Sequence, residues 1–99
     1  MDSNFGSIST ETRMITPTHA AMLLRNNPHN RRVSPKTVNR YANAMTSGDW
    51  PCNGAPIIIN GDGTLGDGQH RLMACVQSGR AFPSLIVKGV SKDTFDTLD

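Results

Sequence analysis

Cysteine is scarce in this chain of 99 residues, and each of the two that occur stands alone. Neither Cys52 nor Cys75 has a second cysteine or a histidine at the spacing of a zinc site, so we expect no structural metal. Cys75 sits among apolar residues, as a small buried side chain would. The two unlike cysteines favour a reduced protein without a disulfide framework.

Long hydrophobic runs and a secretory signal are lacking as well. We therefore expect no membrane partner and a cytoplasmic location. Apolar residues make up 36% of the chain and aromatic residues 5%, which predicts a single domain with a modest core. A homodimer would suit so small a core, although no residue pattern shows one.

Acidic residues are missing from one long segment. Between Thr12 and Gly48 there is no Asp or Glu, whereas six basic residues lie there. They are Arg13, Arg25, Arg31, Arg32, Lys36 and Arg40. This asymmetry favours an anionic partner, such as a nucleotide or a nucleic acid, over a neutral ligand. The plainer alternative is a solvated basic face.

Two Ser/Thr-Pro pairs mark the starts of helices. Thr16-Pro17 and Ser34-Pro35 each combine a side chain that caps the first N–H groups with a proline suited to the first helical position. The first helix should end at Asn26-Asn27-Pro28 and the second at Gly48. The connector between them, residues 29–32, is basic and precedes a helix N-terminus, so it too is expected to face an anion.

Residues typical of strands fill much of the rest of the chain. The strongest strand is Pro56–Asn60, which an Asn-Gly-Asp-Gly turn joins to a short returning strand at Thr64-Leu65. A weak strand is expected over Ile8–Ile15 and a further one over Ser84–Lys88. Between the last two strands, His70–Ser78 has the apolar pattern of a helix.

The alternation of helices and strands predicts a small α/β, or α+β, domain in which helices pack on a mixed sheet. We divide the chain into residues 1–13, a tail with the first strand, and residues 14–99, the domain proper. Ser91 is expected to cap a final helical segment that carries Phe95 and Leu98.

The stretch with the clearest chemical character is Gly66-Asp67-Gly68-Gln69-His70-Arg71, a glycine-rich turn that runs into a helix. Its glycines would let the backbone turn tightly and approach a ligand, and the N–H groups of the helix start would point at that ligand. His70 and Arg71 add donors where the helix dipole already favours an anion. We therefore predict a phosphate site, with a solvated polar turn as the alternative.

The order of elements and this motif together resemble the ParB/sulfiredoxin-like superfamily, and in particular its Asp-Gly-Gln-His-Arg branch. The resemblance covers roughly Met14 to Asp99. It is most specific in Leu65–Ala74, followed by Ser78-Gly79 and the strand Leu85–Lys88. It implies a ParB/sulfiredoxin-like single domain of the kind carried by phages and plasmids, which would act in the host cytoplasm if a phage encodes it.

The motif also resembles the nucleotide site of that superfamily residue by residue. Gly68-Gln69-His70-Arg71 is similar to the Gly-Glu-Arg-Arg motif with which ParB proteins hold phosphates, and its first and last residues match. The resemblance further implies that Asn30 and Arg31, with Arg32 beside them, contact the ligand from the connector.

Gln69 departs from both known versions of the motif. It replaces the acid of ParB proteins and the reactive cysteine of sulfiredoxins, so sulfiredoxin activity is not expected and nucleotide hydrolysis is put in doubt. The chain also lacks the helix-turn-helix and dimerisation regions of a partition protein, so it is not expected to segregate DNA alone.

Three functions remain open. The first is binding of a nucleotide or nucleotide-derived signal at the motif, without catalysis. The second is a nucleotide-dependent enzyme, an ATPase, phosphotransferase or nuclease, in which Asp67 and His70 act on a nucleotide with Mg²⁺. The third is binding of DNA or RNA through the basic segment 25–40. The residues expected to contact the nucleic acid are Arg31, Arg32, Lys36 and Arg40.

Overall fold

The computed structural model describes residues 8–27, 32–50 and 55–90 of the chain. Three helices and four strands lie within these residues. In chain order they are β1 (Ser9–Ile15), α2 (Pro17–Arg25), α3 (Pro35–Ser47), β2 (Ile57–Asn60), β3 (Leu65–Asp67), α4 (Gln69–Ser78) and β4 (Phe82–Val90). The predicted class, a small α+β fold with a mixed sheet, is confirmed.

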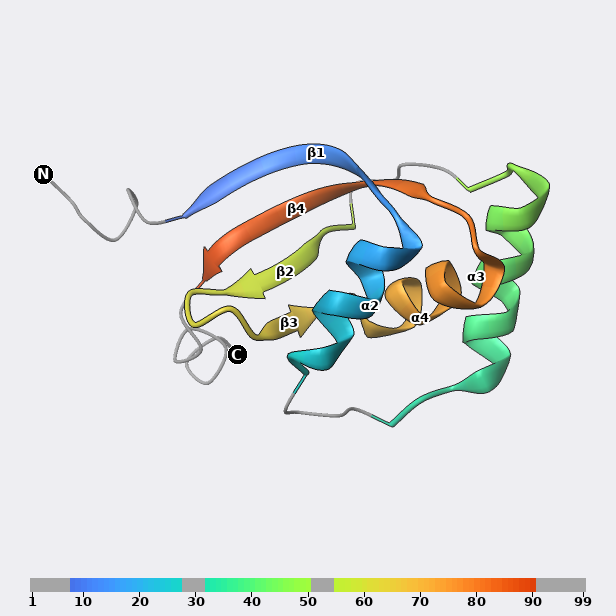
Figure 1. The fold of residues 1–99 in the computed structure, drawn as a ribbon, viewed down its shortest axis with the longest axis horizontal. Helices are drawn as coiled ribbons and strands as arrows, with labels where there is room; N and C mark the ends of the chain where they lie inside the picture. Colours follow the sequence, from blue (N-terminus) through green and yellow to red (C-terminus); the bar gives the residue numbers. More distant parts are fainter. Residues whose placement is uncertain (1–7, 28–31, 51–54, 91–99) are drawn as a thin grey trace, which may run out of the picture.

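The four strands form one sheet in the order β1-β4-β2-β3 (Figure 1). β1 runs antiparallel to β4, β2 runs parallel to β4, and β2 and β3 form an antiparallel hairpin. β4 therefore occupies an interior position with a neighbour on each side. This position requires residues that can be buried, and alternate residues of β4, Phe82, Ser84 and Ile86, are buried accordingly.

The helices lie on one side of the sheet, with α4 between α2 and α3 (Figure 1). α4 is consequently the most enclosed helix, and its residues Leu72, Ala74 and Cys75 have no exposed surface. They pack with Ile57 and Ile86 of the sheet in the same core. The motif that opens α4 is thus attached to the best buried helix of the fold.

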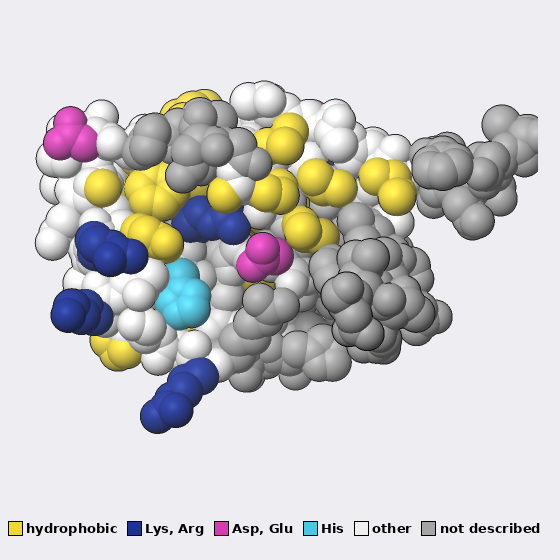
Figure 2. Space-filling view, turned by 180° about the vertical axis from the view of Figure 1, so that it is seen from behind, with side chains coloured by type: hydrophobic (Ala, Val, Ile, Leu, Met, Phe, Trp, Pro, Cys, Tyr) yellow, Lys and Arg dark blue, Asp and Glu magenta, His cyan; other side chains and the backbone are white. Residues whose placement is uncertain are grey.

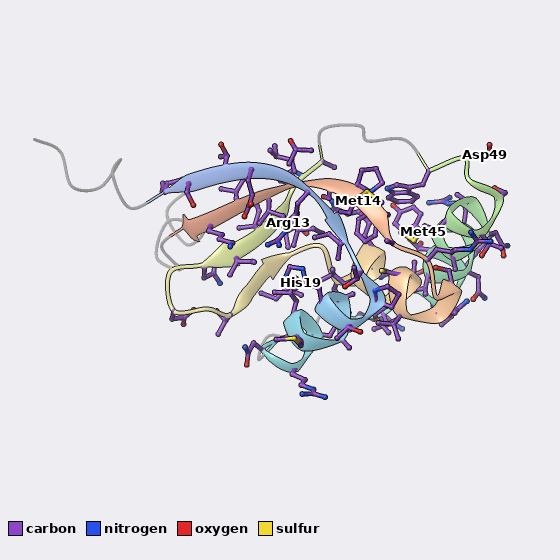
Figure 3. All side chains as sticks on the ribbon, turned by 45° about the horizontal axis from the view of Figure 1, so that its top comes forward. Arg13, Met14, His19, Met45 and Asp49 are labelled. Atoms are coloured by element: carbon purple, nitrogen blue, oxygen red, sulfur yellow. The ribbon has the colours of Figure 1, made fainter. Side chains whose placement is uncertain are left out.

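The edge of the core is closed by aromatic residues. Trp50 packs edge-on against Tyr41 and Phe82, with ring centroids 5.1 and 5.8 Å away. Met45, which Figure 3 labels, is buried beside them in the core. These contacts show that Trp50 seals the edge of the core, and they also assign Tyr41 a packing role.

The two predicted Ser/Thr-Pro helix starts are confirmed in detail. The side chain of Thr16 accepts the N–H of His19 at 3.1 Å, and that of Ser34 accepts the N–H of Thr37 at 3.3 Å. Gly48 ends α3 with a left-handed φ of 81°. The final helix expected after Ser91 lies outside the described residues.

Two strands are longer than the sequence predicts. The returning strand of the hairpin extends to Asp67 rather than stopping at Leu65, so it enters the glycine-rich motif. β4 extends beyond the expected Ser84–Lys88 at both ends, because its pairing with β1 continues to Phe82 and its pairing with β2 to Val90. The ends of β4 are thus set by partners distant in the sequence, whereas β3 is extended by its own hairpin partner.

Candidate functional site

The motif turns at a single glycine. Gly68 is the residue before α4, its φ of 113° is one that side chains disfavour, and a methyl group there would collide with Ile57. Gly66 has no positive φ and lies within β3, where an added methyl group would come within 2.8 Å of Asn60 Oδ1. The expectation that both glycines form the turn is therefore wrong, and Gly66 instead allows close packing inside the hairpin.

Asp67 lies directly at the start of α4. Its Oδ1 accepts the N–H of Gly68 at 2.9 Å, which places a carboxylate beside the helix N-terminus. A carboxylate in this position is stabilised by the helix dipole. The Asp67 carboxylate also repels an incoming anion. A phosphate therefore has fewer favourable positions at the start of α4 than the sequence suggests.

Gln69 joins the motif to the end of α2. Its side chain is buried, with 7% exposure, and its Oε1 accepts a hydrogen bond from Asn27 Nδ2 at 2.8 Å. One residue earlier, the carbonyl of Asn26 accepts the N–H of Leu65 at 2.7 Å. The end of α2 is therefore fastened both to β3 and to α4. This gives Gln69 a positioning role that the sequence did not reveal.

His70 joins the motif to the start of α3. Its Nε2 accepts the backbone N–H of Ser34 at 3.0 Å, which leaves Nδ1 as the protonated nitrogen of the neutral ring. Further along the same pair of helices, Gln77 Nε2 donates to Asn39 Oδ1 at 2.8 Å. The two contacts hold α4 against α3 and bring the start of α4 close to the residue that precedes α3, while the two helices cross each other (Figure 1).

Arg71 is turned toward the main chain that precedes β2. Its Nη1 donates to the carbonyl of Ala55 at 2.6 Å and its Nη2 to that of Pro56 at 3.0 Å. The guanidinium has five N–H donors, so it keeps others for a ligand. Two of the donors that we expected to serve an anion are used here to hold the backbone.

Cationic side chains lie in or near the first turns of α3 and α4, with the Asp67 carboxylate beside them. Neither α3 nor α4 has an acidic residue in its first turn. Lys36 lies in the first turn of α3, Arg71 in that of α4, and the exposed Arg32 lies shortly before α3. The positive ends of both helix dipoles therefore lie near cationic side chains.

The described residues on either side of the basic connector lie against the motif. Asn27 on one side of it contacts Gln69, and Ser34 on the other side contacts His70. Two of the residues proposed for ligand contact, Asn30 and Arg31, lie outside the described residues. Among the described connector residues, Arg32 is the exposed cation.

A basic stripe continues from the connector along α3. Lys36 and Arg40 are four residues apart and both exposed, so they lie on one face of the helix. Figure 2 shows Lys and Arg side chains gathered toward the end of the molecule that α3 forms. Asp49 lies just past the other end of α3 and is labelled in Figure 3, so the stripe is separated from this carboxylate by most of the helix.

The two catalytic candidates each make a hydrogen bond with the backbone, Asp67 with Gly68 and His70 with Ser34. Across residues 8–27, 32–50 and 55–90, no group of three or more His, Cys, Asp or Glu side chains is arranged to hold a metal ion. Both candidate side chains are thus held against the main chain.

The sequence interpretation missed three partners of the motif. They are the amide of Asn27 and the carbonyls of Ala55 and Pro56. Asn27 carried only a weak signal, as a polar residue just after a helix. The two carbonyls carried none, because every residue has one.

None of the described helices has the length and apolar character needed to cross a membrane. Comparisons of the chain with family models, with curated protein sequences and with solved structures found no match.

Proposed function

We propose that this protein binds a phosphate-bearing ligand, a nucleotide or a nucleotide-derived molecule, where α3 and α4 begin. One observation carries the proposal: the hydrogen bond from Ser34 N–H to His70 Nε2 joins two helix N-termini that have no acidic residue in their first turns. Helix N-termini of this kind attract and orient phosphate groups.

The donors available to the ligand come from three sources. Helical geometry leaves the N–H groups of the first turn of α4, such as those of His70 and Arg71, without acceptors inside the helix. His70 adds its Nδ1–H, and Arg71 adds the donors that Ala55 and Pro56 do not use. Arg32 and Lys36 supply exposed positive charge at the start of α3. A phosphate bound there would be held by hydrogen bonds first and by flexible cations second.

Mg²⁺ would accompany a nucleoside di- or triphosphate. This ion is usually held by phosphate oxygens, water and one or two carboxylates. Asp67 is the carboxylate beside the start of α4 and would offset its own repulsion of the phosphates through such an ion. This is the role we assign to Asp67 in the proposed complex.

Binding is favoured over catalysis by the state of the motif. Gln69, which stands where related motifs carry an acid or a cysteine, is buried and bonded to Asn27. Its amide is neither a general base nor a nucleophile. His70 Nε2 is already an acceptor for Ser34, so the ring is oriented for hydrogen bonding through Nδ1.

Isothermal titration calorimetry tests the proposal. The protein is titrated with nucleoside triphosphates, with and without Mg²⁺, and with cyclic and short oligonucleotide signals. We expect saturable heat with at least one of them. The paired change Arg32→Ala with Lys36→Ala should weaken it at least tenfold, which corresponds to about 1.4 kcal/mol.

The matched control is Arg80→Ala. Arg80 is also an exposed arginine, but it follows the opposite end of α4. Arg80→Ala should leave the affinity for the phosphate ligand unchanged. Absence of heat with every phosphate ligand, or equal weakening by the control, would show that the proposed site is wrong.

The stripe of Arg32, Lys36 and Arg40 favours a second candidate function, binding of DNA or RNA along α3. All three side chains are exposed in the part of the chain that the structure describes. Fluorescence anisotropy with a labelled single strand should show an affinity that falls steeply with salt. Arg40→Ala should weaken this binding and leave nucleotide binding unchanged, and a salt-independent affinity would exclude it.

We further propose that the protein is a ParB/sulfiredoxin-like domain that acts in a reducing cytoplasm. The order of its elements and the sequence of the motif support the first part. The free, buried thiol of Cys75 supports the second.

A further inference from the structure

The two edges of the sheet differ in how they are protected. β3 is a three-residue strand, and the N–H of Leu65 is covered by the carbonyl of Asn26. β1 has seven residues, six of them exposed, and among the described residues it pairs only with β4. A long open edge is a template for another strand.

The open edge of β1 also lacks the proline, glycine and β-bulge that often block pairing, and its charged residues are one acid and one base. Ser9–Ile15 contains no proline or glycine, and its register with β4 continues without a shift over all seven residues. The other two strand pairs each contain an irregularity. β1 is therefore the edge of this sheet with the regular register, although the strand itself is curved (Figure 1).

We propose that β1 pairs antiparallel with β1 of a second copy of this chain, around a two-fold axis at Thr12. In this register Thr12 faces the partner subunit's Thr12. Glu11 faces the partner subunit's Arg13, and the same pair forms again on the other side of the axis. Opposite charges and paired threonines are favourable cross-strand neighbours.

The charges of Glu11 and Arg13 favour this register over the two in which the axis is shifted by one residue. In a continuous sheet, the side chains of two facing residues point to the same side. The two-fold axis must therefore lie between two copies of the same residue, rather than between two successive positions of the sequence. An axis at Glu11 would place two carboxylates opposite each other, and an axis at Arg13 would do the same with two guanidinium groups. Only the axis between them, at Thr12, makes both facing pairs attractive.

Contacts within the chain prepare these two side chains for such pairing. Glu11 lies 3.4 Å from Lys88 Nζ and 3.8 Å from Arg13 Nη1, and all three side chains remain nearly half exposed. These contacts hold the Glu11 side chain beside its neighbours on the sheet, so it does not extend freely into solvent. On the opposite face of β1, Met14 is 56% exposed and would be covered by the partner subunit's Thr10.

Charge reversal tests the proposal. Sedimentation or light scattering at tens of micromolar should show a dimer for the wild type. Glu11→Arg or Arg13→Glu alone should give a monomer, because each puts like charges opposite each other. The double variant should restore the dimer, and so should an equimolar mixture of the two single variants. Arg80→Glu, an equal change of charge away from β1, should remain a dimer.

Disulfide trapping tests the register in a Cys52→Ser background. Thr12→Cys should crosslink two copies under mild oxidation, because facing residues of antiparallel strands lie within the span of a disulfide. Thr10→Cys, on the same face, should not, since the two copies of residue 10 would be roughly 14 Å apart. Far-UV circular dichroism confirms that each variant is folded.

A monomeric wild type would overturn the proposal. It would show that the edge is covered by another segment of the chain or serves a different partner. A dimer in which Thr12→Cys does not crosslink, or in which Thr10→Cys crosslinks equally, would overturn it as well. Nucleotide titration reports on the starts of α3 and α4, so failure of one proposal does not imply failure of the other.

Discussion

The three helices begin in two different ways. α2 and α3 start with Thr16 and Ser34, whose side chains cap the first turn, and each has a proline next. α4 starts at Gly68, which has a left-handed backbone and no side chain to form a cap. The starts of α2 and α3 are stabilised by residues a few positions away in the sequence, whereas the start of α4 is stabilised by distant parts of the chain.

This difference makes the start of α4 depend on tertiary contacts. The first turn of α4 is held by Asn27 through Gln69, by Ser34 through His70, and by Ala55 through Arg71. Each contact is separated by at least 16 positions in the sequence. A helix start that lacks a local cap has N–H groups to offer a ligand, and tertiary contacts keep it in place.

The largest effect is expected from Gly68→Ala. The residue has a φ of 113°, and the new methyl group would collide with Ile57 in the core. Backbone strain and overpacking together should lower the free energy of unfolding by about 3 kcal/mol. Urea denaturation measures this change.

Gly48→Ala is the matched control for that prediction. Gly48 has a positive φ of 81° at the end of α3, but an added methyl group would meet nothing within 4 Å. It should cost about 1 kcal/mol, the price of the left-handed backbone alone. Equal losses in the two variants would mean that the close contact with Ile57 is irrelevant.

Replacement of Arg71 tests the tertiary support of α4. Arg71→Ala removes two charged hydrogen bonds to Ala55 and Pro56 and should cost about 2 kcal/mol of stability. Arg71→Lys keeps the charge but lacks the forked geometry, so it should recover only part of the loss. An unchanged unfolding midpoint for Arg71→Ala would show that this contact does not stabilise the fold.

The capped helix starts provide a smaller effect. Ser34→Ala and Thr16→Ala each remove one side-chain cap and should each cost about 1 kcal/mol. Ser34 N–H still reaches His70 in the first variant, because that contact uses the backbone. Calorimetry should therefore find nucleotide binding unchanged in both, and a loss of affinity in Ser34→Ala alone would assign the hydroxyl group to the site.

The sequence predicted what local chemistry determines. Thr16 and Ser34 were identified as caps, and Gly48 as a helix end, because each acts on neighbours within four residues. The hairpin was found from its turn for the same reason. The α+β class followed from the order of these elements.

The details of the site could not be predicted in the same way. Gly66 looks like a turn residue until its strand is paired with β2, whose register with β3 shifts between Ile58 and Ile59. Arg71 has the same donors for a carbonyl as for a phosphate, and its acceptors lie 15 and 16 positions earlier. The chain brings such groups together only when it folds, so residue type alone does not identify their partners.

The smallest effect concerns His19 in the first turn of α2. Partial burial lowers its pKa below 6.5, and the charges of Arg13 and Lys88 add to this against the opposing effect of Glu11. The unfolded chain, where the pKa is about 6.5, therefore takes up the proton at a higher pH than the folded chain. The stability that depends on neutral His19 is fully present above this value and is lost as the pH falls through 6.5 toward the lower pKa of the folded state.

His19→Gln should remove this contribution. The difference in unfolding free energy between wild type and variant should shrink or change sign when urea denaturation at pH 7.5 is repeated at pH 5, because only the wild type gains a proton on unfolding at the lower pH. Carboxylates titrate in both proteins and cancel in the comparison. A difference that is the same at both pH values would mean that burial and the neighbouring cations do not disfavour the charged form of His19. The first turn of α2 would then tolerate a positive charge. We infer the same for the first turn of α4 when it holds an anion.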